Sequence, residues 1–192
     1  MTTRQSRNRP PRRCACYREF PNLAHRNALQ ERLEVPALVR LLDLPRGRRV
    51  LEVGCGRGVA LPVLAALCDP TRLTGLDIDP ALIVHADRHL GARGVAAELC
   101  CGDVREMPFP DGSFDLVVDF GTCYHVSRPE AAIGEIARVL GDGGQFVHET
   151  RLSQLLAHPR RSTGRKLPWS AAPDLVRSRS ALLWAIDSVE AA

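Results

Sequence analysis

Long apolar runs are absent from this chain of 192 residues. No stretch approaches the roughly 20 consecutive apolar residues needed to cross a bilayer, and the basic N-terminus is not followed by an apolar signal core. The sequence therefore predicts a cytoplasmic protein with no membrane partner. A chain of this length can bury one full core, so one domain is expected.

Regularly spaced pairs of cysteines are also absent. The chain has 7 cysteines, an odd number, and no two of them form a C-x-x-C pair. Disulfide frameworks and zinc ribbons need cysteines in regularly spaced pairs. Neither is expected here, and no metal site is predicted.

Charge is distributed unevenly along the chain. Nine basic and four acidic residues lie in 1–45, ten and fifteen in 46–150, and seven and three in 151–192. The arginine-rich start is mixed with small polar residues and cannot bury enough apolar surface to fold, so residues 1–16 are predicted to be a disordered basic tail. Such a tail either keeps the protein soluble, the favoured interpretation, or holds a nucleic acid or an acidic substrate.

Helical and strand patterns alternate through the rest of the chain. Apolar residues recur at helical spacing over 22–43, which predicts one or two helices within an N-terminal segment, 17–45. Further strands are predicted at 49–53, 72–76, 95–101, 114–118 and 145–149, and helices at 59–67, 80–90 and 129–140, the last stopped by Gly141. This alternation predicts an α/β fold, with a doubly wound, mostly parallel sheet and helices on both faces.

A glycine-rich turn, Gly54-Cys55-Gly56-Arg57-Gly58, follows the first predicted strand. Glycines let the main chain approach a ligand closely, and the helix that follows offers free N–H groups. The spacing is G-x-G-x-G, and Val59 stands where a dinucleotide fingerprint has its third glycine. The turn therefore predicts an adenosine cofactor other than a dinucleotide.

Carboxylates follow the second and third predicted strands. Asp77 lies 21 residues after Gly56, a separation at which an acidic side chain accepts hydrogen bonds from ribose hydroxyls. Asp79 stands directly before Pro80 and is predicted to cap the next helix. Asp103 is either an acceptor for an adenine amine or a turn residue. The ligand is expected at the carboxyl ends of the strands, where these residues fall.

Several motifs occur in a characteristic order along the chain. They are Val50–Gly58, Leu73–Asp79, Gly102–Phe109, Phe114–Val118, and Arg138–Leu140 followed by Gly143-Gly144. Together they resemble class I S-adenosylmethionine-dependent methyltransferases. The run Pro108–Asp115 is similar to one in the small-molecule branch that includes quinone-biosynthesis methyltransferases.

This resemblance implies a Rossmann-like fold over 46–150 and S-adenosylmethionine as the cofactor, with S-adenosylhomocysteine as the product. It implies that the glycine loop holds the methionine end, that Asp77 binds the ribose, and that Glu52 organises the loop and the cofactor's amino group. It also implies that Asp103 and the neighbouring Val104 bind the adenine. The cofactor-binding residues expected on this basis are Glu52, Gly54, Cys55, Gly56, Gly58, Asp77, Ile78, Asp103, Val104 and Phe120.

The acceptor side of the site is expected just beyond the fourth strand. Methyl transfer needs mainly alignment, and a base is required only where the acceptor loses a proton. His125 is the candidate base, with a structural histidine as the alternative. Tyr124 is a candidate to orient the substrate, with simple packing as the alternative. Glu149, at the end of the fifth strand, either faces the acceptor or is a plain strand-end carboxylate.

Residues 151–192 are expected to complete the same domain. A short helix is predicted at 152–156, a basic loop at 159–168, and a shortened C-terminal hairpin from 175–176 and 181–186. The sequence thus predicts a monomeric or homodimeric enzyme that methylates a small molecule. The alternatives are an RNA methyltransferase that uses its basic flanks, and an inactive cofactor-binding regulator.

Overall fold

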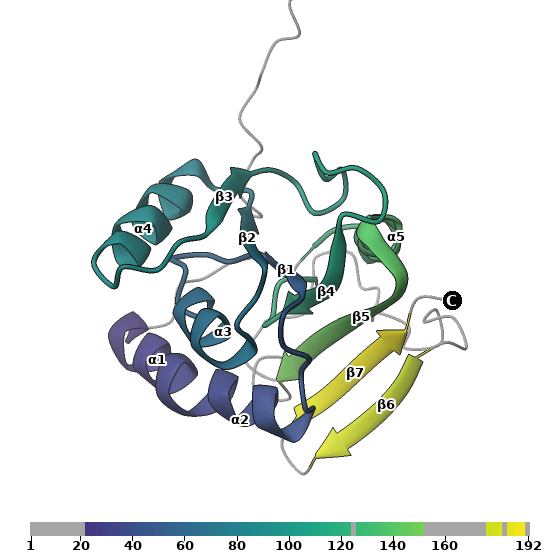
Figure 1. The fold of residues 1–192 in the computed structure, drawn as a ribbon, viewed down its shortest axis with the longest axis horizontal. Coiled ribbons are helices and arrows are strands. Elements are labelled where there is room, and N and C mark those ends of the chain that lie inside the picture. Colours follow the sequence, from purple (N-terminus) through teal and green to yellow (C-terminus); the bar gives the residue numbers. More distant parts are fainter. Residues whose placement is uncertain (1–21, 124–125, 152–175, 182–183, 191–192) are drawn as a thin grey trace, which may run out of the picture.

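The computed structural model describes residues 22–123, 126–151, 176–181 and 184–190, the last two stretches by their backbone alone. Seven strands form one sheet in the order β3-β2-β1-β4-β5-β7-β6 (Figure 1). The pairs among β1 to β5 are parallel, whereas β7 is antiparallel to both β5 and β6. The strands are β1 Arg49–Val53, β2 Arg72–Asp77, β3 Glu98–Cys101, β4 Phe114–Asp119, β5 Leu140–Arg151, β6 Val176–Ala181 and β7 Trp184–Glu190.

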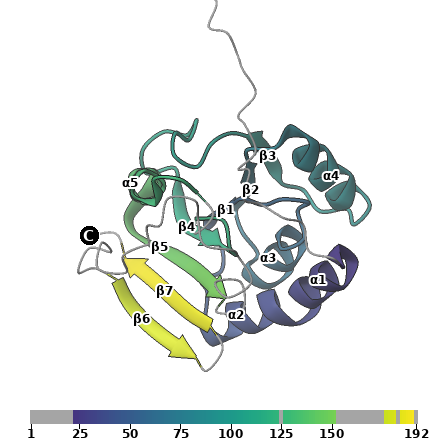
Figure 2. The same cartoon turned by 180° about the vertical axis from the view of Figure 1, so that it is seen from behind.

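Helices cover both faces of the sheet. They are α1 Leu23–Leu29, the π-helical turn η1 Gln30–Glu34, α2 Val35–Leu41, α3 Leu61–Cys68, α4 Pro80–Gly91 and α5 Pro129–Val139. Figures 1 and 2 show the first four α-helices grouped together, with α5 apart from them. Among the described residues, no helix combines the length and the hydropathy needed to cross a membrane.

The side chains of alternate strand residues belong to two separate apolar clusters, one on each face of the sheet. Val50, Leu116 and Val118 pack with residues of α2, α3 and α4 on one face. Leu51 and Val117 pack with residues of α5 on the other. Because side chains of a strand alternate between the two faces, a parallel strand covered on both sides becomes a nearly continuous apolar run. The predicted doubly wound sheet with helices on both faces is confirmed.

The helix boundaries follow local signals. The Asp79 side chain accepts a hydrogen bond from the Ala81 N–H at 2.9 Å and Pro80 occupies the first turn of α4, so the predicted cap is confirmed. The predicted helices over 22–43 are likewise present as α1, η1 and α2.

Three boundary predictions were wrong. The third strand begins at Glu98 rather than at residue 95. The strand β5 begins at Leu140, directly after α5, and its register with β4 shifts between Phe114 and Leu116, so Gly141 lies within a strand irregularity. The C-terminal hairpin consists of β6 Val176–Ala181 and β7 Trp184–Glu190, rather than of the predicted segments 175–176 and 181–186. Predictions for 1–21 and 152–175 lie outside the described residues.

Candidate active site

The glycine loop lies at the carboxyl end of β1 and has the backbone geometry that its sequence predicts. Gly54, Gly56 and Gly58 have φ values of +66°, +56° and +72°, a region that disfavours other residues. A Cβ atom on Gly54 would lie 1.8 Å from the Thr122 Oγ1, so only glycine lets the loop after β4 approach so closely. The loop is held to β2 by a 2.9 Å hydrogen bond from the Cys55 N–H to the Leu76 carbonyl.

Asp77, the last residue of β2, is fixed by the backbone around it. Its Oδ2 accepts a hydrogen bond from the Gly56 N–H at 2.8 Å, and its Oδ1 accepts one from the Asp79 N–H at 2.9 Å. The side chain is buried, and this burial raises its pKa although the two hydrogen bonds act in the opposite direction. The carboxylate therefore joins the glycine loop to the start of α4.

Three further buried carboxyl groups lie at strand ends, and with Asp77 they form what we call the carboxylate cluster: Glu52, Asp77, Asp119 and Glu149. Burial raises the pKa of Glu52 well above its ordinary value, and the charges of Asp77 and Asp119 raise it further. The Glu52 Oε2 is buried and has no hydrogen-bond partner among the described residues. Buried acceptors of this kind are costly unless a ligand meets them.

Helix α1 contributes a positive charge to this cluster. Burial raises the pKa values of Glu52 and Glu149, and the charge of Arg26 lowers both of them by a smaller amount. The resulting pKa of Glu149 is about 7. The Arg26 Nη1 also donates to the Gln30 Oε1 at 2.6 Å. Sequence analysis missed Arg26 because no spacing rule connects a residue of the N-terminal helix to the end of a strand.

Asp119 and His148 form a second polar unit, at the ends of β4 and β5. The Asp119 side chain is fully buried and accepts hydrogen bonds from the N–H groups of Gly121, Thr122 and Cys123 at 2.5–2.9 Å. The His148 Nδ1 lies 2.8 Å from its Oδ2. Burial alone would raise the pKa of Asp119, but the His148 charge and these hydrogen bonds hold it below its ordinary value.

His148 was not predicted as a site residue. Its pairing with Asp119 follows from the parallel register of β4 and β5, in which the two residues are opposite each other. The ring is largely buried, with 14% of the side chain exposed. An ionised Asp119 makes Nδ1 the protonated nitrogen and leaves Nε2 as the basic atom.

The carboxylate of Asp103, in the predicted adenine-binding segment, is already paired with an arginine. Both oxygens of Asp103 accept hydrogen bonds from the Arg105 guanidinium, at 2.5–3.1 Å, and this pairing lowers the Asp103 pKa. Arg105 also donates to the Ser127 Oγ at 2.8 Å. An adenine amine would therefore share Asp103 with Arg105, and the predicted role of Asp103 stays a prediction.

The remaining predicted cofactor residues differ in exposure. Val104 and Phe120 are buried in the two apolar clusters, so their side chains serve packing. Ile78 is partly buried, and its carbonyl accepts a weak hydrogen bond from the Cys101 Sγ at 3.7 Å. Cys55 is buried, which raises its thiol pKa and is consistent with its predicted packing role. Tyr124 and His125 lie outside the described residues.

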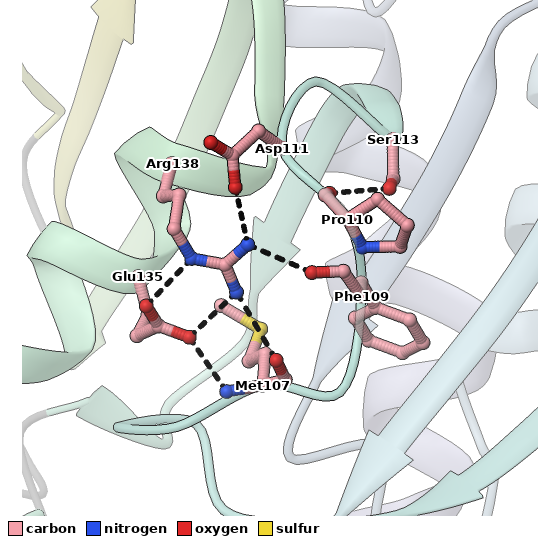
Figure 3. A network of polar contacts seen from close by, with 7 residues as sticks. All are labelled: Met107, Phe109, Pro110, Asp111, Ser113, Glu135 and Arg138. Carbon is pink, nitrogen blue, oxygen red and sulfur yellow. Dashed lines mark hydrogen bonds and ion pairs between the residues drawn. The ribbon is translucent and has the colours of Figure 1, made fainter.

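A network centred on Arg138 of α5 fastens the loop that follows Asp103 (Figure 3). Its guanidinium donates to the Met107 and Phe109 carbonyls at 3.1 and 2.7 Å, and to the Asp111 Oδ1 at 2.7 Å. Two more hydrogen bonds join Arg138 to Glu135, whose Oε2 accepts from the Met107 N–H at 2.7 Å. Two motifs far apart in the sequence are thus one structural unit.

Comparisons with known proteins identify the family of this chain. The family model described as "Methyltransferase domain" matches residues 51–148, which extend from within β1 into β5. The chain belongs to this family. It is a class I S-adenosylmethionine-dependent methyltransferase domain, a family whose cofactor is S-adenosylmethionine.

Individual relatives of this methyltransferase domain act on different molecules. The fatty-acid O-methyltransferase of Mycolicibacterium smegmatis is 38% identical over 102 residues, which are 53% of this chain and 36% of the relative. The phosphatidylethanolamine N-methyltransferase of Cereibacter sphaeroides is 38% identical over 104 residues, 53% of this chain and 50% of the relative. The matches thus span half or less of these relatives. No comparison singles out the quinone-biosynthesis branch.

A solved structure matches over most of the chain. The crystal structure of a SAM-dependent methyltransferase from Aquifex aeolicus superposes with a TM-score of 0.71, covering 86% of this chain and 93% of the other. The two sequences are only 16% identical, so this likeness establishes the fold and nothing finer. The predicted Rossmann-like architecture is confirmed.

The residues at the strand ends fit the cofactor. S-adenosylmethionine carries a positive sulfonium and a positive ammonium group, and each needs a negative or polar environment. The carboxylate cluster supplies buried carboxyl oxygens whose ionised form a cationic ligand would favour, and the Glu52 Oε2 has no hydrogen-bond partner among the described residues. The glycine loop supplies a close backbone approach beside it.

Proposed function

We propose that this chain transfers a methyl group from S-adenosylmethionine to a small organic acceptor, by in-line displacement at the methyl carbon. The observation that carries the proposal is the buried carboxylate cluster beside the glycine loop, where a cationic methyl donor would be stabilised. Relatives that methylate fatty acids and phosphatidylethanolamine support a small, partly apolar acceptor.

The residues of this chain divide the task of binding. Glu52 would accept from the ammonium group and Asp77 from the ribose hydroxyls, while Gly54 and Gly56 let the main chain approach the methionine end. Bound cofactor supplies a methyl group that the sulfonium already activates. What the protein adds is mainly orientation, which is worth several powers of ten in rate.

For an acceptor that must lose a proton, we assign the general base to His148. Asp119 holds its Nδ1 at 2.8 Å and stabilises the charged ring, so that Nε2 can take the proton. The alternative base, His125, lies outside the described residues. In the sequence it follows closely on Thr122 and Cys123, whose N–H groups donate to Asp119.

The first experiment is a calorimetric titration with S-adenosylmethionine and S-adenosylhomocysteine, with NAD as the control. Saturable binding of both sulfur compounds and none of NAD is expected. Methyl transfer is then measured with labelled cofactor on fatty acids, phospholipid headgroup amines and an RNA pool. Turnover on RNA alone would overturn the small-molecule proposal, and binding without turnover on any acceptor would favour an inactive regulator.

The assignment of His148 is tested by His148→Gln. Loss of the base should lower turnover about 100-fold, remove the acidic limb of the pH–rate profile, and leave cofactor affinity nearly unchanged. A structural role would instead lower cofactor affinity or the melting temperature along with turnover. Equal turnover in the variant would refute His148 as the base without touching the proposed methyl transfer.

A further inference from the structure

A basic pocket lies beside the glycine loop, between that loop and the helices α1 and α4. Asn27 of α1, Arg57 and Val59 of the loop, and five residues of α4 and its C-terminal end line it: His85, Arg88, His89, Ala92 and Arg93. Helices α1 and α4 lie beside α3 in both views of the molecule (Figures 1 and 2). None of the described residues that line the pocket is acidic.

Two arginines of the pocket have side chains without a partner among the described residues. The guanidinium groups of Arg57 and Arg88 make no hydrogen bond or ion pair with any residue that the structure describes. Arg93 differs, because its Nη2 donates to the Glu31 Oε1 at 3.0 Å and its Nη1 lies 3.1 Å from the His89 Nδ1. Glu31 thus offsets only one of the three guanidinium charges, and the pocket keeps a net positive charge.

His89 adds a directed donor. Because Arg93 can only donate, the His89 Nδ1 must accept, and Nε2 carries the proton. This Nε2 is buried and has no hydrogen-bond partner among the described residues. Burial, together with the charge of Arg93, lowers the pKa of His89, so the ring stays neutral with a fixed N–H.

We propose that this pocket binds a phosphate group, carried by a ligand other than the methyl donor. Guanidinium forks match the oxygens of a phosphate, and Arg57 and Arg88 approach the pocket from different segments. Convergence from α1, the loop and α4 suits one compact group, whereas an extended polyanion would need a basic stripe. Phosphate chemistry is common to soluble phosphorylated metabolites and to lipid headgroups.

The test is a titration of the full chain with inorganic phosphate, followed through the phosphorus resonance of the ligand. Saturable binding is expected, and the double variant Arg57→Gln/Arg88→Gln should weaken it about 100-fold, or roughly tenfold for each arginine. The matched control is Arg40→Gln, an exposed arginine of α2 outside the pocket, which should bind phosphate as the unaltered chain does.

Three outcomes overturn the proposal: no saturable phosphate binding, equal binding by the double variant and the unaltered chain, or binding to an RNA oligonucleotide alone. A second measurement separates the sources, using flotation with phosphatidylcholine vesicles that contain or lack phosphatidic acid. Flotation that requires phosphatidic acid and is lost in the double variant supports a lipid headgroup as the ligand. Binding of inorganic phosphate without flotation supports a soluble ligand. Both readouts are independent of methyl transfer.

Discussion

At the scale of single residues, the site depends on positions where only one side chain fits. Gly54 is one, since any Cβ would collide with Thr122. Asp77 is another, because each of its oxygens already accepts a backbone hydrogen bond and still has a lone pair for a ligand. One carboxylate therefore shapes the loop and remains available to bind.

Asp77→Asn should weaken S-adenosylmethionine binding about 30-fold. The amide keeps the volume but places an NH₂ group against the N–H of Gly56 or Asp79, and it removes one acceptor from the site. Calorimetry on the variant measures the loss, with Asp87→Asn, an exposed residue of α4, as the matched control. Unchanged affinity in Asp77→Asn would refute the ribose assignment.

Sequence reasoning found Asp77 and the three glycines because these residues are tied to local chain geometry, at fixed positions after a strand. It did not find Arg26 or His148. Those two reach the site through the packing of α1 and through the register of β4 against β5. Neither relation leaves a fixed spacing in the sequence.

At the scale of elements, one arginine connects a helix to a distant loop. Arg138 makes five hydrogen bonds, three of them to the loop residues 107, 109 and 111, and its partner Glu135 accepts one more from the Met107 N–H. The sequence showed two separate motifs. In the structure, Arg138 of the second motif holds the loop of the first motif, residues 107–111, by hydrogen bonds.

Arg138→Ala should lower the free energy of unfolding by about 3 kcal/mol, because two backbone carbonyls and two carboxylates lose charged donors together. Arg138→Lys should recover only part of this, since an ammonium group cannot reproduce the planar fork. Urea denaturation measures both, with Arg40→Ala as the control for removing an exposed arginine. A loss no larger than that of the control would show that the network adds nothing to stability.

At the scale of the whole molecule, the carboxylate cluster makes stability depend on pH. The pKa of Glu149 is raised by burial from 4.5 to about 7, so the folded protein keeps a proton that the unfolded chain has released. This stabilising contribution is complete below about pH 4.5 and is lost as the pH rises to about 7. The same sign applies to Glu52.

Glu149→Gln should therefore flatten the fall in stability between about pH 4.5 and 7, gaining up to about 3 kcal/mol over the unaltered chain at pH 7. Urea denaturation across this range measures it, with the exposed Glu106→Gln as the control. Parallel curves for Glu149→Gln and the unaltered chain would show that Glu149 is not a buried, proton-holding group in the folded protein.

The sequence by itself determined the architecture and the class of cofactor. The alternation of strand and helix patterns forces a parallel sheet, and the glycine loop and Asp77 fall at its carboxyl edge because strand ends are local features. The tertiary structure alone decided which charges meet. Glu52, Asp119, Glu149 and His148 come from three strands and Arg26 from a helix, and their pKa values arise from burial and mutual distance, which exist only once the chain is folded.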